Sequence, residues 1–134
     1  MEALKAVVRY ADGKVIKGFI QNFFPNKDHF HLQPHEKSSG QDMRQIQIKD
    51  LKAIFFVKDF SGNPVYEERR QFVSSDKPQG RKIEVIFKDG EKLAGSTLGY
   101  DPSRQGFFIH PIDDRSNNIR VFVVQSFVDR VRTL

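Results

Sequence analysis

Short segments in which apolar and polar residues alternate run through most of the chain, and they predict β-strands rather than helices. In the first part of the chain these segments end at turn-forming pairs such as Asp12-Gly13 and Pro25-Asn26. Asp-Gly between two apolar strands is a strong signal for a β-hairpin. The predicted strands cover residues 4–10, 14–24, 29–33, 44–48 and 52–57. Residues 35–42, rich in serine, glycine and charge, are expected to form a loop.

The same pattern returns 77 residues later, where residues 83–111 align without a gap with residues 6–34. Seven positions are identical: Val8, Asp12, Gly13, Gly18, Pro25, Phe30 and Pro34 recur as Val85, Asp89, Gly90, Gly95, Pro102, Phe107 and Pro111. The second set of strands is predicted at residues 82–87, 92–100, 107–111, 119–124 and 127–132. The repeat indicates that one small β unit is used twice.

The chain between the two copies has the composition of a linker. Residues 58–80 contain two runs rich in serine, glycine and proline, and a short helical turn is expected at residues 66–70. We predict two small domains, residues 1–57 and residues 81–134, joined by this linker. Half of a chain of 134 residues is near the lower limit for an independent core, so the two domains are expected to share an interface.

Each copy carries a glycine inside its second strand, which typically marks a sharp bend where a sheet curls into a barrel. A strand, an Asp-Gly turn, a strand with an internal glycine and an aromatic turn resemble the first sequence motif of Sm-like proteins. The residues that carry this resemblance are Val8, Asp12, Gly13, Gly18, Phe23 and Leu32, with Val85, Asp89, Gly90, Gly95, Tyr100 and Ile109 in the second copy. Residues 48–54 and 125–131 are similar to the last two strands of such a barrel.

The resemblance implies an all-β fold made of two tandem five-stranded barrels of the Sm-like or SH3-like kind. The whole chain also resembles an uncharacterised bacterial family of tandem barrels of this type. Pairing of strand edges between the copies would resemble the way in which Sm-like proteins form rings. The tandem arrangement could instead satisfy these edges internally, so either a monomer or a small homo-oligomer is expected.

Composition narrows the class of protein. A hydrophobic content of 38% with 13 phenylalanines favours a packed core over disorder. Lys and Arg exceed Asp and Glu by 22 to 17, and the resulting charge of +5 is a mild bias toward anionic partners on an otherwise mixed-charge surface. The absence of cysteine excludes disulfides and thiol chemistry. Because no apolar run is long enough for a signal peptide or a membrane span, a cytoplasmic protein without a membrane partner is expected.

Aromatic and basic residues gather in the turns after the second strand of each copy. Aromatic rings stack on unpaired bases, and nearby cations contact phosphates, as in single-strand binding proteins. The candidate residues for nucleic-acid or partner binding in these turns are Phe24, Asn26, Lys27, Tyr100, Ser103 and Arg104. Asn117, Asn118 and Arg120 join them because Asn can read base edges and Arg can bind phosphate. The alternative interpretation is that the aromatic residues belong to the barrel cores and that the polar and basic residues belong to ordinary turns.

Residues 101–106 match the D-x-S-x-x-G half of the PilZ signature for cyclic-di-GMP. The other half, R-x-x-x-R, should lie upstream, but Arg69, Arg70 and Arg81 do not have that spacing. Binding of cyclic-di-GMP is therefore a further, weaker hypothesis.

Catalytic and metal-binding patterns are sparse. His29, His31, His35 and Glu36 could together hold a metal ion, but the second copy lacks this set. None of the G-x-S-x-G, H-E-x-x-H and G-K-[ST] motifs occurs. We predict no catalytic residues, no metal and no cofactor, and hence a protein that is not an enzyme.

Two functional classes remain. One is an interaction or regulatory module that binds an unknown protein partner through a sheet edge or the polar loops. The other is a module for single-stranded RNA or DNA that uses the basic turns. The first is preferred, because RNA-binding Sm-like proteins carry an Arg-Gly step between their last two strands. This chain has Lys49-Asp50 and Gln125-Ser126 there.

Overall fold

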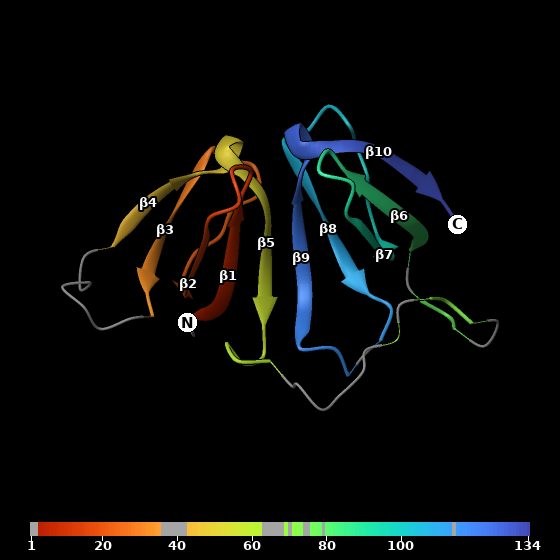
Figure 1. Cartoon of the computed structure of the whole chain (residues 1–134), viewed down its shortest axis with the longest axis horizontal. Helices are drawn as coiled ribbons and strands as arrows, with labels where there is room; N and C mark the ends of the chain where they lie inside the picture. Colours follow the sequence, from red (N-terminus) through yellow and green to blue (C-terminus); the bar gives the residue numbers. More distant parts are fainter. Residues whose placement is uncertain are drawn as a thin grey trace.

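The computed structural model describes residues 3–35, 43–62, 69, 71–73, 76–78, 80–113 and 115–134, and this part of the chain is all-β, as predicted. The strands are β1 (Leu4–Tyr10), β2 (Val15–Ile20), β3 (His29–Pro34), β4 (Arg44–Gln47), β5 (Leu51–Val57), β6 (Arg81–Phe87), β7 (Lys92–Thr97), β8 (Gly106–Pro111), β9 (Asn118–Val124) and β10 (Val128–Thr133) (Figure 1). Two 3-10 helices, η1 (Ile48–Asp50) and η2 (Gln125–Phe127), connect β4 to β5 and β9 to β10. Among the described residues, no helix has the length and apolar character needed to cross a bilayer.

Two strands are shorter in the structure than the sequence predicts. The sequence predicts a strand at residues 14–24, but β2 ends at Ile20. It also predicts a strand at residues 92–100, but β7 ends at Thr97. Beyond the end of each strand, Phe23 packs against Phe30 and Tyr100 packs against Phe107. The helical turn expected at residues 66–70 lies outside the described residues, apart from residue 69.

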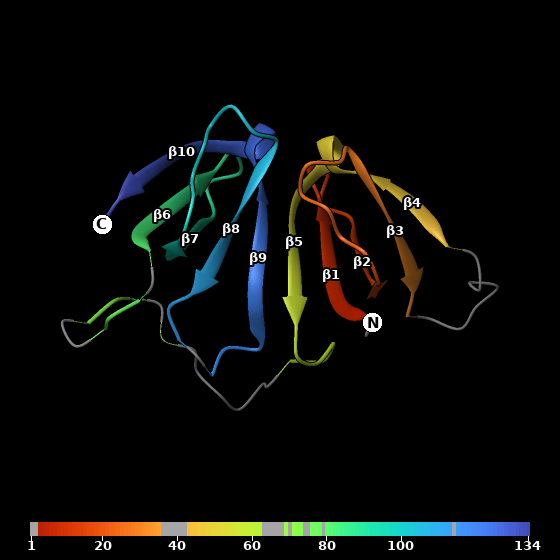
Figure 2. The same ribbon diagram turned by 180° about the vertical axis from the view of Figure 1, so that it is seen from behind.

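All ten strands belong to one antiparallel sheet with the order β10-β6-β7-β8-β9-β5-β1-β2-β3-β4. Figures 1 and 2 show two curved lobes that meet where β5 runs beside β9. In this central pair Ala53 faces Val123 and Phe55 faces Val121. The two halves of the chain are therefore joined by backbone hydrogen bonds as well as by side chains.

The strand pairings of the two halves have the same register. Ala6 of β1 pairs with Gly18 of β2, and Ile83 of β6 pairs with Gly95 of β7, a shift of 77 residues. The same shift of 77 residues converts the register of β2–β3 into that of β7–β8, and the register of β3–β4 into that of β8–β9. It also converts the register of β1–β5 into that of β6–β10. The order β5-β1-β2-β3-β4 in the first half thus returns as β10-β6-β7-β8-β9 in the second.

Gly18 and Gly95 lie where neighbouring strands approach too closely for a side chain. A Cβ atom on Gly18 would stand 2.4 Å from the carbonyl oxygen of Gln33, and one on Gly95 would stand 2.3 Å from that of His110. Both distances are far below van der Waals contact, so any other residue would push the strands apart. This explains why glycine occupies the same place in both halves.

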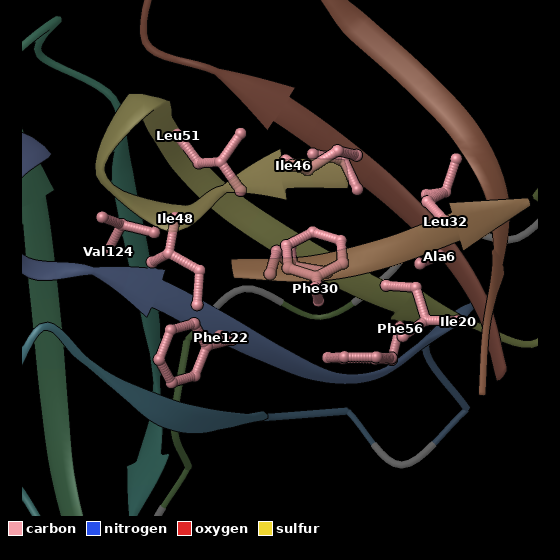
Figure 3. Close-up of a cluster of buried hydrophobic side chains, with 12 residues drawn as sticks. Ala6, Ile20, Phe30, Leu32, Ile46, Ile48, Leu51, Phe56, Phe122 and Val124 are labelled. Carbon is pink, nitrogen blue, oxygen red and sulfur yellow. The ribbon is translucent and has the colours of Figure 1, made fainter. Parts of the chain in front are cut away.

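The hydrophobic cores of the two halves exchange side chains across the central pair. Phe122 and Val124 of β9 belong to the core of the first half, where Figure 3 shows them beside Ile48. Ala53 of β5 belongs to the core of the second half. Because most of β5 and the second half of β9, residues 121–124, are buried on both faces, these stretches are largely apolar instead of alternating.

A buried lysine adds a polar tie between the halves. The Nζ atom of Lys52 on β5 donates hydrogen bonds to Asp89 at 2.7 Å and Glu91 at 2.5 Å, both in the turn between β6 and β7. The ammonium group also lies 4.9 Å from the ring centroid of Phe87. Burial alone would lower the pKa of Lys52, but the two carboxylates outweigh it and raise the pKa above its ordinary value.

Candidate functional site

The turns after β2 and β7, which carry most of the predicted site residues, contact each other at the junction of the two halves. The Nε2 atom of Gln105 donates a hydrogen bond to the carbonyl oxygen of Pro25 at 2.6 Å, and another to that of Lys27. The ring of Phe23 packs edge-on against Phe122, with 5.0 Å between centroids. The first turn therefore covers part of the face formed by β8 and β9.

Beside this contact lies a groove of about 670 Å³. Its apolar lining comes from the turn between β7 and β8 and from β8 and β9 themselves, with one residue from the first half: Leu98, Tyr100, Phe107, Phe108, Phe122 and Pro25. Leu98 is 68% exposed, the largest exposed fraction among the exposed large hydrophobic residues of the described chain. Such a side chain lowers its free energy when a ligand covers it.

Arg120 supplies a positive charge within this apolar lining. Its guanidinium carbon lies 4.3 Å from the ring centroid of Phe108 and 5.1 Å from that of Phe56. Partial burial lowers the pKa of Arg120, although an arginine stays charged at neutral pH. Within the described residues, Arg120 makes no ion pair with a carboxylate. A partly desolvated cation without a counter-ion favours the binding of an anion.

At the rim of the groove, Arg104 and Asp101 face each other. The Nε atom of Arg104 is 3.8 Å from Oδ2 of Asp101, a loose and exposed pair. Ser103 donates hydrogen bonds to Asp101 through its hydroxyl at 2.7 Å and its amide at 2.9 Å. These bonds lower the pKa of Asp101. Ser103, predicted as a ligand contact, thus holds the turn that presents Arg104.

Three predicted residues of the first turn lie outside the groove lining. Phe24 is 50% exposed, and the ammonium group of Lys27 lies 5.5 Å from its ring centroid. Asn26 is also exposed. Together they form a small basic and aromatic surface on the first half.

Asn117 and Asn118 also lie outside the groove lining, at the start of β9. The carboxamide of Asn117 accepts a hydrogen bond from the amide of Asp59 at 3.0 Å and donates one to its carbonyl at 2.8 Å. Asn118 pairs with Val57 at the end of the central strand pair. Asn117 therefore holds the chain that follows β5. The residue type alone does not tell this structural role from ligand binding.

The histidines do not gather around a common centre. The rings of His29 and His31 are 5.7 Å apart, and Nδ1 of His29 lies 2.7 Å from Asp28. Among the described residues, no group of three or more His, Asp or Glu side chains could hold a metal ion. Glu36, the fourth member of the predicted set, lies outside the described residues.

Of the nine predicted site residues, the structure brings Tyr100, Arg104 and Arg120 together in the groove. Sequence reasoning missed Leu98 and His110 as lining residues. A signal for Leu98 exists, because it is an apolar residue directly after the buried Thr97, where alternation would place a polar one. His110 had no comparable signal.

The fold and the groove define an all-β protein in which one ten-stranded antiparallel sheet carries a largely apolar groove, and the arginine in this groove has no carboxylate partner among the described residues. The chain belongs to a family of unknown function, DUF6982, whose family model matches residues 2–134. Comparison with curated proteins and with solved structures finds no match.

Proposed function

We propose that this protein is a non-catalytic binding module, made of two tandem five-stranded Sm-like barrels at residues 1–57 and 81–134, that binds a segment of a partner protein. The shared strand order and the constant 77-residue shift in register support the tandem interpretation. The binding site is the groove along β8 and β9. The observation that carries this function is Arg120, a partly buried cation within an apolar lining that has no carboxylate partner among the described residues.

A groove suits a partner protein better than the sheet edges do. The groove combines an exposed leucine with aromatic side chains and two arginines, and aromatic residues and arginine are enriched at protein interfaces. The two edge strands, β4 and β10, instead expose Arg44, Gln45, Asp129 and Arg130. Charged edges of this kind discourage the addition of another strand.

Single-stranded nucleic acid is the second candidate ligand. Phe24 is half exposed with Lys27 beside its ring, an arrangement that could stack a base and contact a phosphate. The net charge of +5 favours the same class of ligand.

Selection from a phage library of random peptides, about 12 residues long, tests the proposal. We expect enriched peptides whose binding, measured by fluorescence anisotropy, is lost in Leu98→Glu. This variant should fold, because the side chain is exposed, and its carboxylate would occupy the groove. Val15→Glu is the matched control, since Val15 is another exposed apolar residue, at 44%, in the first half.

Two results would contradict peptide binding in the groove. If no enriched peptide depends on Leu98, the groove is not a peptide site. If oligouridylate then binds with a steep inverse dependence on salt that Phe24→Ala with Lys27→Ala abolishes, the nucleic-acid function replaces it.

A further inference from the structure

We propose that the groove recognises one carboxylate, presented by an otherwise apolar segment of the partner protein, and that Arg120 binds it. This inference rests on the proposed function, because it names the chemistry of the ligand that the same groove takes. A glutamate or aspartate side chain flanked by apolar residues is the ligand in question.

The Arg120 side chain is held in place and is ready to bind an anion. Its guanidinium lies against Phe108 and Phe56, and none of its N–H groups donates a hydrogen bond within the described part of the chain. A guanidinium presents a rigid, planar fork of donors that matches the two oxygens of a carboxylate. Because the group is already partly desolvated and held by aromatic rings, less hydration and less side-chain freedom are lost when a carboxylate binds.

The charge around the groove favours one carboxylate over a chain of phosphates. Of the described side chains that line it, only Arg104 and Arg120 carry a permanent positive charge, and Arg104 already faces Asp101. A nucleic acid would bring several phosphates past that aspartate. Tight binding of a phosphate backbone needs several cations in a row.

The described residues of the first half do not form a counterpart of this groove. Under the 77-residue shift, Arg120 corresponds to Met43, Phe108 to His31 and Phe122 to Gln45. All three first-half residues are exposed, and β4, which carries Gln45, is an edge strand. Only β9 has a neighbour, β5, that places Phe56 under the arginine. One ligand per chain is therefore expected.

Two blocked peptides test the inference: acetyl-Ser-Leu-Glu-Phe-Ser-amide and the same peptide with glutamine in place of glutamate. Binding to the full chain is followed by ¹⁵N NMR, which detects the Nε–H of Arg120 and the amides of Leu98 and Tyr100. The glutamate peptide is expected to shift these signals and to bind at least about tenfold more tightly than the glutamine peptide. A continuous-variation analysis should give one peptide per chain.

Three variants assign the preference to Arg120. Arg120→Gln should bind both peptides equally, at the affinity of the glutamine peptide for the wild type. Arg120→Lys keeps the charge but loses the planar fork, so it should retain only part of the preference for the glutamate peptide. This variant also tests the role of Arg120 if Arg120→Gln does not fold. Arg130→Gln is the matched control, an exposed arginine on β10 outside the groove, and should leave the preference unchanged.

The outcomes separate this inference from the proposed function. Equal binding of both peptides in the groove of the wild type overturns the carboxylate inference and leaves peptide binding standing. Shifts of the groove signals by eight-residue oligouridylate but by neither peptide overturn both. Absence of groove shifts with either peptide at millimolar concentration overturns the inference, and the phage selection then decides the function on its own.

Discussion

Single polar side chains tie together segments that are far apart in the sequence. Lys52 is only 8% exposed and reaches Asp89 and Glu91 in the other half. Gln105 joins the two turns beside the groove, and Asn117 holds the chain after β5. Their residue types are typical of surfaces, so only their contacts identify them as structural. Arg120 differs from them, because it lies in the groove and makes no ion pair within the described residues.

Lys52→Met tests the tie between the halves through its pH dependence. The hydrogen bond from Lys52 holds the pKa of Asp89 below its ordinary value of 3.8. A lowered folded pKa means that the stabilisation is present above pH 3.8 and is lost as the pH falls through the folded pKa. The stability of the wild type relative to the variant should therefore drop by about 1 kcal/mol or less on acidification, because both carboxylates are partly exposed.

Urea unfolding at neutral pH and at acid pH, below the folded pKa of Asp89, measures this difference. The pKa of Lys52 is raised, so its own contribution should persist at neutral pH and disappear only as the pH rises above 10.5. Lys14→Met, at an exposed lysine, is the control and should show no such trend. A difference between wild type and Lys52→Met that does not change with pH would contradict the interpretation.

At the scale of elements, equivalent strands of the two halves have opposite surroundings. β9 lies inside the sheet and is apolar, whereas its equivalent β4 is an edge strand and is polar. β5 and β10 differ in the same way. The continuous apolar runs at residues 53–57 and 121–124 are therefore the sequence signal for the two strands that meet at the centre.

Alanine substitutions at equivalent positions of β9 and β4 test this contrast. Phe122 is fully buried, and Phe122→Ala should lower the free energy of unfolding by about 3–5 kcal/mol through lost burial and a cavity. Gln45, its equivalent 77 residues earlier, is exposed, and Gln45→Ala should change the free energy by less than about 0.5 kcal/mol. Chemical denaturation measures both. Similar costs for the two variants would show that β9 is not the shared internal strand.

At the scale of the whole molecule, the same central pairing could in principle continue from one copy to the next. The ten-stranded sheet ends in β4 and β10, which are the equivalents of the two strands that pair at its centre. Where the central strands carry Val121, Phe122 and Phe55, the edges carry Arg44, Gln45 and Arg132. Pairing of these edges would bury charge in place of apolar surface, so we expect a monomer.

Exchanging edge residues for those of the central strands tests this expectation. The changes Arg44→Val and Gln45→Phe on β4, with Arg130→Ala and Arg132→Phe on β10, give both edges the apolar character of the centre. Light scattering should report 15.5 kDa for the wild type and larger, head-to-tail assemblies for this fourfold variant. The two variants with only one altered edge are the controls and should remain monomers. A ring formed by the wild type would refute the argument.

The sequence predicted the fold more completely than it predicted the site. Turns at Asp12-Gly13 and Asp89-Gly90 need positive φ angles that glycine adopts easily, and Gly13 and Gly90 have φ of 99° and 91°. Such turns are local and can be recognised from a few residues. Tyr100, Arg104 and Arg120 belong to the groove for a non-local reason, because β8, β9 and the turn between β7 and β8 converge there.

Local sequence is enough to predict the strands, their turns and the apolar runs at the centre of the sheet, because each depends on neighbouring residues or on period-two alternation. The contacts between distant segments show that β5 pairs with β9, that Asn117 is structural, and that Arg120 lies in the groove without a carboxylate partner among the described residues. The physical reason is that burial, desolvation and pairing of a side chain depend on segments brought from elsewhere in the chain. The residues next to Arg120 in the sequence therefore do not show which side chains surround it in the folded protein.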